Sequence, residues 1–265
     1  MTRRIPVTFA LAFTAAMVVA ACNGIAPSPS PSPSDLPDAT AVINAATTSS
    51  QAAKSVHAQI AVDGEAAVAL PIGGASGSVD LTGTTASADL DKANSAAHAT
   101  FSVPGFLNLS GELIAIDGKA YLKTTLTGAQ YRNIGGSTAL PVDPSNTNGL
   151  LKSLGEFLLK PGVDPVKGED VTCGSKQCYT VSVDLDPAEL APLIGTAANG
   201  LPINLAGAAL QMTIRVEKDA PNRLGGLNAK ITMADGNVVN ADVTFSKWDE
   251  PVTVTAPSPD QIAPG

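Results

Sequence analysis

Aliphatic residues alternate with polar or small residues through most of the chain, in many short runs. Because successive side chains of a β-strand point to opposite faces of a sheet, this two-residue period puts the aliphatic side chains of each run on one face. Of the 265 residues, 44% are hydrophobic but only 4% are aromatic. The pattern predicts an antiparallel sheet with one aliphatic face. The runs are Ile60–Val62, Val79–Leu81, Phe101–Leu113, Ala120–Leu126, Val181–Leu185, Met212–Val216, Ile231–Met233, Val239–Phe245 and Val252–Val254.

Turn signals separate several of these runs. Asp-Gly at 63–64 and at 117–118, and the glycine at 236, predict hairpin turns. Within one run the parity changes, because Ile114 and Ile116 fall on the opposite parity from the residues before them. This change predicts a bulge, or a crossing of the sheet edge, near Leu113. The residues that share the earlier parity are Phe101, Val103, Leu107, Leu109 and Leu113.

Three segments have helical rather than strand character. Residues 39–53 contain neither Gly nor Pro and follow Asp38, which is a good N-cap residue. Residues 148–160 are rich in leucine and are followed by Gly162. Asp186-Pro187-Ala188-Glu189 is typical of a helix start and leads into further apolar residues. Short apolar helices of this kind are expected to cover the apolar face of the sheet, which gives an α+β architecture.

The N-terminus has the features of an export signal. Arg3 and Arg4 form a cationic region, and an apolar stretch from Val7 to Ala20 follows. The next residues complete Val19-Ala20-Ala21-Cys22, which resembles a bacterial lipobox. By this analogy residues 1–21 are a signal peptide, and Cys22 becomes the lipidated first residue of the mature chain. The alternative is an ordinary secretory signal that happens to contain a cysteine.

A Pro/Ser-rich segment follows the lipobox. Residues 27–34 alternate strictly between Pro and Ser, and such a sequence adopts an extended polyproline conformation at about 3.1 Å per residue. Residues 22–37 are therefore interpreted as a lipidated cysteine with a tether, and O-glycosylation of the tether remains open. The folded domain is expected over 38–256, with a flexible C-terminal tail over 257–265.

Cys173 and Cys178 flank a glycine-containing tip between two strand-like segments. An exported protein enters an oxidising compartment, so we expect a disulfide across this hairpin. A metal site is the competing interpretation, but no nearby histidine or second cysteine pair supplies the remaining ligands of zinc.

Composition and motifs argue against two classes of function. The 16 Lys and Arg against 24 Asp and Glu give a net charge of −8, and no basic cluster suits nucleic acid. His57 and His98 are far apart and have no metal-ligand spacing, and no nucleophile or phosphate-binding motif is present. We therefore expect a protein that is not an enzyme, with no catalytic residue, metal or cofactor.

Two interpretations of the apolar face remain. Sheet and helices either close on a solid core, as in a structural or adhesive envelope lipoprotein, or stand apart around an aliphatic cavity. Frequent Ala and Gly in the strands and the few aromatic residues favour a cavity slightly. An aliphatic cavity suits acyl chains better than polar or aromatic ligands.

Three short segments and the N-terminus carry a family resemblance. The segments are Lys54-Ser55-Val56-His57, Ile116-Asp117-Gly118-Lys119-Ala120-Tyr121 and, most specific, Phe245-Ser246-Lys247-Trp248-Asp249-Glu250-Pro251-Val252-Thr253-Val254. With the lipobox and the tether, they resemble the LppX/LprAFG family of actinobacterial lipoproteins over about residues 38–255. The hairpin of Cys173 and Cys178 is not a general mark of this family, and residues 66–99 match nothing sharply.

The resemblance implies a strongly bent antiparallel half-barrel with helices on its concave face, similar to LolA and LolB, enclosing a hydrophobic cavity. It implies a carrier of multi-acylated lipids or lipoglycans, lipid-anchored at the outer face of the cytoplasmic membrane, with a membrane lipid exporter as a candidate partner. Trp248 and Pro251 are expected to pack at the end of the sheet. The candidate cavity residues are Val103, Leu107, Leu109, Leu113, Leu154 and Leu158.

Overall fold

The computed structural model describes residues 36, 38–69, 76–136, 147–186 and 207–264. Within them, two α-helices, α2 (Ala39–Ala52) and α3 (Thr147–Leu158), accompany a sheet of thirteen strands. The strands are β1 (Ser55–Ala69), β2 (Ser76–Asp80), β3 (Thr84–Asp91), β4 (Ala96–Val103), β5 (Leu109–Ile116), β6 (Lys119–Thr124), β7 (Arg132–Gly136), β8 (Val166–Lys167), β9 (Val171–Cys173), β10 (Lys176–Leu185), β11 (Ala209–Glu217), β12 (Leu224–Thr232) and β13 (Val238–Ser246).

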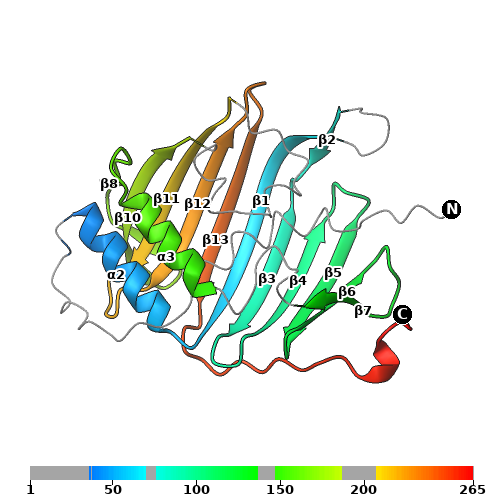
Figure 1. The fold of residues 1–265 in the computed structure, drawn as a ribbon. Coiled ribbons are helices and arrows are strands. Elements are labelled where there is room, and N and C mark those ends of the chain that lie inside the picture. Colours follow the sequence, from blue (N-terminus) through cyan, green and yellow to red (C-terminus); the bar gives the residue numbers. More distant parts are fainter. Residues whose placement is uncertain (1–35, 37, 70–75, 137–146, 187–206, 265) are drawn as a thin grey trace.

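The sheet is antiparallel and open, in the order β7-β6-β5-β4-β3-β1-β13-β12-β11-β10-β8. β2 pairs with the end of β1, and β9 pairs with β10. The first long strand, β1, lies in the middle of the sheet because it pairs with β3 on one side and with the last strand, β13, on the other. Two meanders thus meet at β1 and β13, and the expected α+β half-barrel is confirmed (Figure 1).

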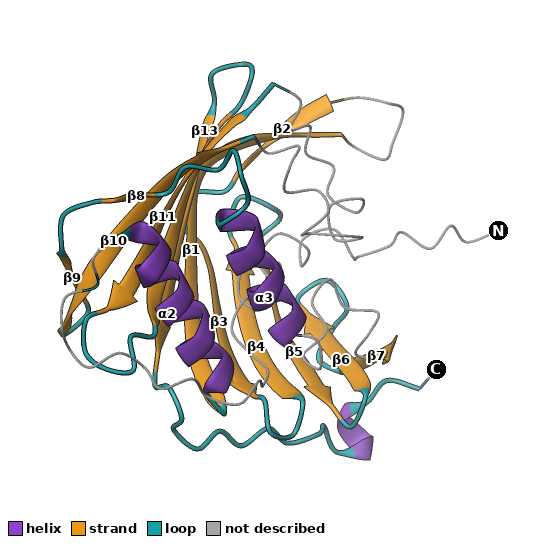
Figure 2. Cartoon of the chain, turned by 60° about the vertical axis from the view of Figure 1, so that its left-hand side comes forward, coloured by secondary structure: helices purple, strands orange, loops and turns teal. Residues whose placement is uncertain are grey.

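The two helices lie on the concave side of the sheet (Figure 2). Asp38 caps α2 as expected, since its carboxylate accepts a hydrogen bond of 2.8 Å from the backbone N–H of Ala41. One face of α2 is buried, including Val42 and Ile43, and the helix contacts β10, β11, β12 and α3. α3 ends shortly before Gly162, whose φ is +94°. The expected helix after Asp186, Cys22 and the rest of residues 1–35 lie outside the described residues.

The prediction of a hairpin at Asp63-Gly64 is wrong, because β1 continues without interruption through these residues. Before this point β1 pairs with β3, and after it β1 pairs with β2. Gly64 has a φ of +123°, and a Cβ here would lie 2.1 Å from the carbonyl oxygen of Val238 in β13. The glycine therefore allows β1 to bend where its backbone approaches that of β13 closely. At Asp117-Gly118 the hairpin prediction is correct, with φ values of +52° and +70° between β5 and β6.

The prediction of a bulge near Leu113 is also wrong, because β5 pairs with β4 and β6 without a register shift. Both faces of the sheet are covered here. Leu113 belongs to the main core, whereas Ile114 packs on the opposite, outer face with Tyr121 and Tyr131. The change of parity thus reflects a second, small hydrophobic cluster rather than a break in the strand.

The C-terminal segment completes that small cluster. After β13 the chain passes the strand ends and reaches β7 (Figure 1) without forming the strand expected at Val252–Val254. Ile262 forms a parallel bridge with Tyr131, whose N–H donates to the carbonyl of Gln261 at 2.8 Å. The expectation of a flexible tail over 257–265 is therefore wrong for the residues up to Ala263, which docks through a bond of 2.8 Å from its N–H to the carbonyl of Tyr131.

Candidate functional site

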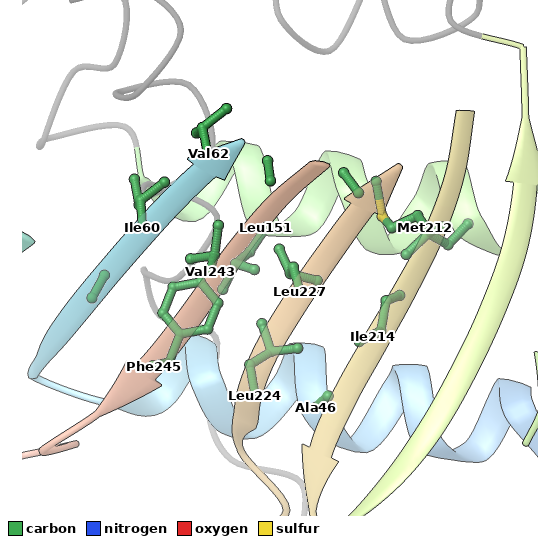
Figure 3. Close-up of a cluster of buried hydrophobic side chains, with 14 of the residues drawn as sticks. Ala46, Ile60, Val62, Leu151, Met212, Ile214, Leu224, Leu227, Val243 and Phe245 are labelled. Carbon is green, nitrogen blue, oxygen red and sulfur yellow. The ribbon is translucent and has the colours of Figure 1, made fainter. Parts of the chain in front are cut away.

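The concave face of the sheet is one continuous apolar surface whose two halves differ in side-chain size. Beneath the helices, β10–β13 contribute large side chains. Ile214, Leu227 and Phe245 lie in this half, with Leu151 of α3 against them (Figure 3). This half is a packed core rather than an open surface.

The other half of the concave face carries rows of alanine between larger side chains such as Phe101 and Leu113. Cross-strand pairs carry Ala58, Ala88 and Ala99 in one row across β1, β3 and β4. A second row pairs Ala97 of β4 with Ala115 of β5. Because neighbouring positions on one face lie about 5 Å apart, such rows leave more room above the sheet than leucine or valine would. Ala88, Ala97 and Ala115 are buried in this structure, so an acyl chain reaches the concave face over β3–β5, the candidate site, only when the groups that cover these alanines move.

Between the helices and the large-residue half, little space is left. A hollow of about 20 Å³ is lined by residues of α2, α3, β11 and β12. A single water molecule needs about 10–15 Å³ by this measure, so an acyl chain does not fit here without movement. The lining residues are Ile43, Ala46, Thr47, Leu151, Leu154, Gly155, Leu158, Ile214, Leu224 and Leu227.

Five of the six predicted cavity residues face the core. Val103, Leu109 and Leu113 are buried in β4 and β5, and Leu158 is buried in α3, where Leu154 is half-buried. Leu107 is different: its side chain is 74% exposed in the turn between β4 and β5. Its assignment to the cavity wall is wrong, because the parity argument assumed one unbroken strand across residues 101–113, whereas residues 104–108 form a turn.

Frequent alanine and glycine in the strands favoured a cavity, but the candidate cavity residues were all large aliphatics and the alanine rows were not among them. A signal for them is present. Alanine alternates with polar residues in Ala86-Ser87-Ala88-Asp89 and in Ala97-His98-Ala99-Thr100, which is the two-residue period of strands with one apolar face. Small residues in this pattern mark a strand face that another group must cover.

The outer face of the same strands is polar. It carries a hollow of about 470 Å³ over β13, β1, β3 and β4, where hydroxyl and amide side chains such as Gln59, Thr85 and Ser102 are mixed with apolar groups. Both histidines lie on this face and contact carboxylates, His57 through Nδ1 to Asp89 at 2.7 Å and His98 through Nε2 to Glu112 at 2.8 Å.

Glu112 is the centre of a small network. Its Oε2 lies 2.6 Å from Nζ of Lys123, which also lies 4.5 Å from the ring centre of Tyr131. Partial burial alone would raise the pKa of Glu112, but hydrogen bonds from Lys123, Tyr131 and His98 outweigh burial and hold it at about 2. The network connects β4, β5 and β6 to Tyr131, which pairs with the C-terminal segment. Within the described ranges, no three His, Cys, Asp or Glu side chains come together as metal ligands.

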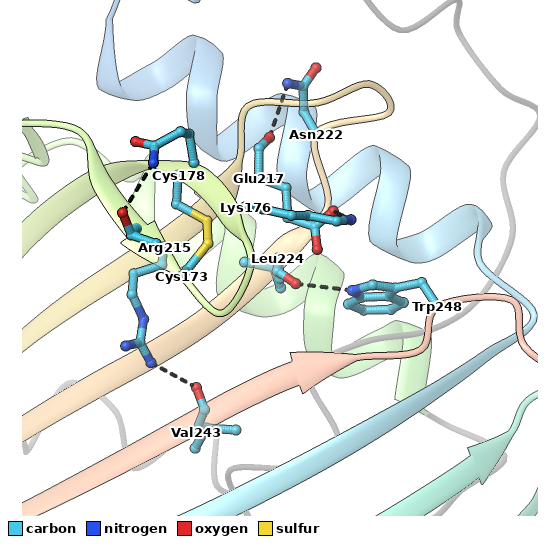
Figure 4. The surroundings of a disulfide bond; sticks show 11 residues. Cys173, Lys176, Cys178, Arg215, Glu217, Asn222, Leu224, Val243 and Trp248 are labelled. Carbon is cyan, nitrogen blue, oxygen red and sulfur yellow. Dashed lines mark hydrogen bonds and ion pairs between the residues drawn. A yellow bond between two sulfur atoms is a disulfide. The ribbon is translucent and has the colours of Figure 1, made fainter.

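Cys173 and Cys178 form the expected disulfide across the β9–β10 hairpin, with Cα atoms 5.9 Å apart (Figure 4). Gly174 takes the tight-turn conformation with a φ of +64°. The sulfur atoms lie against Gly225 of β12, where a Cβ would be 3.0 Å from Sγ of Cys178. The bond therefore fixes an outer strand of the sheet at the helix-covered half.

The Trp248 segment packs at the end of the sheet, as expected. Nε1 of Trp248 donates to the carbonyl of Leu224 at 3.1 Å (Figure 4), and the ring lies 5.9 Å from that of Phe245. The next residue, Asp249, accepts a hydrogen bond of 2.6 Å from the N–H of Lys54 at the start of β1. Pro251, by contrast, is exposed. Over the described part of the chain, neither helix has the length and apolarity that a membrane span requires.

Comparisons with known proteins give one consistent family. The family model described as LppX_LprAFG lipoprotein matches residues 38–254. The lipoarabinomannan carrier protein LprG of Mycobacterium tuberculosis is 28% identical over 262 residues, which are 96% of this chain and 95% of the relative. LprG of Mycobacterium leprae is 27% identical over 263 residues, 96% of each chain.

Solved structures show the same fold. The crystal structure of LprF from Mycobacterium bovis superposes with a TM-score of 0.55 at 20% identity, covering 86% of this chain and 99% of that one. Lipoprotein LppX of Mycobacterium tuberculosis superposes with a TM-score of 0.51 at 16% identity, covering 82% of this chain and 97% of LppX.

Proposed function

The chain belongs to the LppX_LprAFG lipoprotein family, and from this premise we propose that it binds multi-acylated lipids or lipoglycans and carries them across the cell envelope. The observation that carries the proposal is the alanine-built half of the concave face over β3–β5. The name of the LprG relatives, lipoarabinomannan carrier protein, supports a lipoglycan as cargo.

The proposed mechanism is reversible burial of acyl chains, with no covalent step. Each methylene group that leaves water for an apolar site contributes about 0.8 kcal/mol. In this proposal the chains lie over Ala88, Ala97, Ala99 and Ala115, with Val103, Leu109 and Leu113 beside them, once the groups that bury these residues in the present structure have moved. Because the helix-covered half leaves only about 20 Å³, binding there requires α2 and α3 to move away from the sheet. The polar headgroup stays outside the apolar surface, since its burial without partners is costly.

We further propose that Cys22 anchors the protein at the outer face of the cytoplasmic membrane. The lipobox supports this assignment, and two or three acyl chains anchor a protein far more firmly than one. Residues 23–37 then act as a tether of about 45 Å, at about 3.1 Å per residue. Replacing Cys22 by Ala is expected to move the protein from the membrane fraction to the soluble fraction. A Cys22→Ala protein that stays in the membrane as wild type does would contradict the anchor.

One observation favours a rival function. The close packing of α2 and α3 on the sheet, with a hollow of only about 20 Å³, suits a structural or adhesive lipoprotein with a solid core. Native mass spectrometry of residues 23–265, expressed in an actinobacterial host, separates the two. A carrier is expected to give masses above that of the chain, which return to the chain mass after extraction with organic solvent. A protein that is free of lipid in every preparation would favour the solid core.

A further inference from the structure

Two turns at one end of the sheet hold leucine side chains out in solvent. Leu107, between β4 and β5, is 74% exposed, and Leu126, in the turn after β6, is 49% exposed. The turns are neighbours, because the N–H of Thr125 donates to the carbonyl of Ser110 at 2.9 Å. Exposed leucines are ordinary one by one, but a pair on adjacent turn tips forms a small apolar projection.

The backbone at Leu107 gives no structural reason for a leucine there. Its φ is +54°, in the left-handed region that disfavours residues other than Gly, Asn and Asp. The preceding Phe106 packs against the core and holds the turn in place, while Leu107 points away from it. An unfavourable conformation that gains no packing in return points to a role outside the fold.

Both turns can be transferred from water into an apolar phase at a low cost in free energy. Within the first, the N–H of Leu109 donates to the carbonyl of Phe106 at 2.9 Å, and in the second, the N–H of Thr127 donates to that of Thr124 at 3.1 Å. Residues 104–108 and 125–130 contain no charged side chain. Internally bonded backbone and the absence of charge reduce the cost of entering an apolar phase.

We propose that Leu107 and Leu126 insert into the surface of a lipid bilayer. Two side chains on adjacent turn tips fit a fluid acyl phase, whereas a rigid protein partner needs a broader complementary surface. The proposed tether keeps the domain within about 45 Å of the bilayer, so weak insertion is sufficient. Gly105 of the first turn lies against the backbone of Asp80. The carboxylates of Asp80 and Asp63 accept hydrogen bonds from the N–H groups of Thr82 and Gly83, and their negative charge favours uncharged headgroups. This inference does not depend on the cargo.

The test uses the full lipidated protein in phosphatidylcholine vesicles, with an environment-sensitive dye on a single introduced cysteine. Leu107→Cys and Leu126→Cys report on the tips. Val166→Cys is the matched control, because Val166 is also an exposed aliphatic residue, at 63%, but lies in β8 at the far edge of the sheet. Nitroxide groups on the lipid acyl chains quench only dyes that enter the bilayer.

We expect several-fold stronger quenching at positions 107 and 126 than at 166, and weaker quenching at 107 when the vesicles also contain phosphatidylglycerol. Equal quenching at the three positions, or none at 107, would overturn the proposal. Native mass spectrometry of the same proteins keeps the two proposals apart. Bound lipid without quenching at position 107 would contradict only the proposed insertion. Quenching without bound lipid would contradict only the proposed carrier function.

Discussion

At the scale of single residues, the carboxylate of Glu112 ties three strands together through His98 and Lys123. Replacing it by Gln is expected to lower the free energy of unfolding by about 1–2 kcal/mol at neutral pH, because the ion pair with Lys123 is lost and the contact with His98 is weakened. The folded-state pKa of about 2 lies below the ordinary 4.5, so the carboxylate stabilises the fold above about pH 4.5. That stabilisation is lost progressively as the pH falls towards 2.

Urea denaturation of wild type and Glu112→Gln at several pH values checks this prediction. The difference between the two unfolding free energies should narrow as the pH falls below about 4.5. Glu156→Gln is the control, because Glu156 on α3 has a side chain that is 67% exposed and its pair with Lys152 is a surface pair. A Glu112 effect that does not change with pH would show that the network is not electrostatic.

The disulfide is a second stabilising contact at this scale. Because Cys173 and Cys178 close a short loop, replacing both by Ser is expected to lower the free energy of unfolding by about 2 kcal/mol. Thermal unfolding should therefore shift to lower temperature, and adding reductant should lower the melting temperature of the wild type but not that of the double variant. A wild-type melting temperature that is insensitive to complete reduction would refute the prediction.

At the scale of elements, Gly64 controls the bend of β1. Gly64→Ala is expected to cost more than about 2 kcal/mol, because a Cβ would lie 2.1 Å from the carbonyl oxygen of Val238 and φ is +123°. Gly118→Ala is the matched control, since its φ is +70° but nothing lies within 4 Å of a Cβ, so only a conformational cost of about 1 kcal/mol remains. Chemical denaturation measures both. Equal losses of unfolding free energy in Gly64→Ala and Gly118→Ala would mean that the contact with β13 does not constrain the bend.

These two glycines also show what local sequence predicts and what it does not. The cap at Asp38, the helix α3 and the hairpin at Asp117-Gly118 were predicted correctly, because each depends on residues within a few positions. The same Asp-Gly pair at 63–64 forms no hairpin, since β13 passes close to it from far along the chain. The prediction of a bulge at Ile114 failed for a similar reason, because part of the hydrophobic cluster that buries Ile114 comes from Ile262, far along the chain.

At the scale of the whole molecule, β1 and β13 join the helix-covered half of one concave face to the half that carries the alanine rows. The sequence predicted the apolar face, because alternation within a strand is visible in one dimension. It did not predict which part of that face is lined by small residues. That property depends on the pairing of Ala88 with Ala99 and of Ala97 with Ala115 across strands, which only the register provides.

The central claim is that acyl chains occupy the alanine-built half of the concave face, and Ala99→Trp tests it most directly. Ala99 is half-buried on that face, so an indole ring there should occupy the space of the lipid while the protein still folds. Ala61→Trp carries the same change on the exposed outer face of β1. Bound lipid, measured by native mass spectrometry after identical purification, should fall strongly in Ala99→Trp and match wild type in Ala61→Trp. A folded Ala99→Trp protein that retains its full complement of lipid would contradict the account.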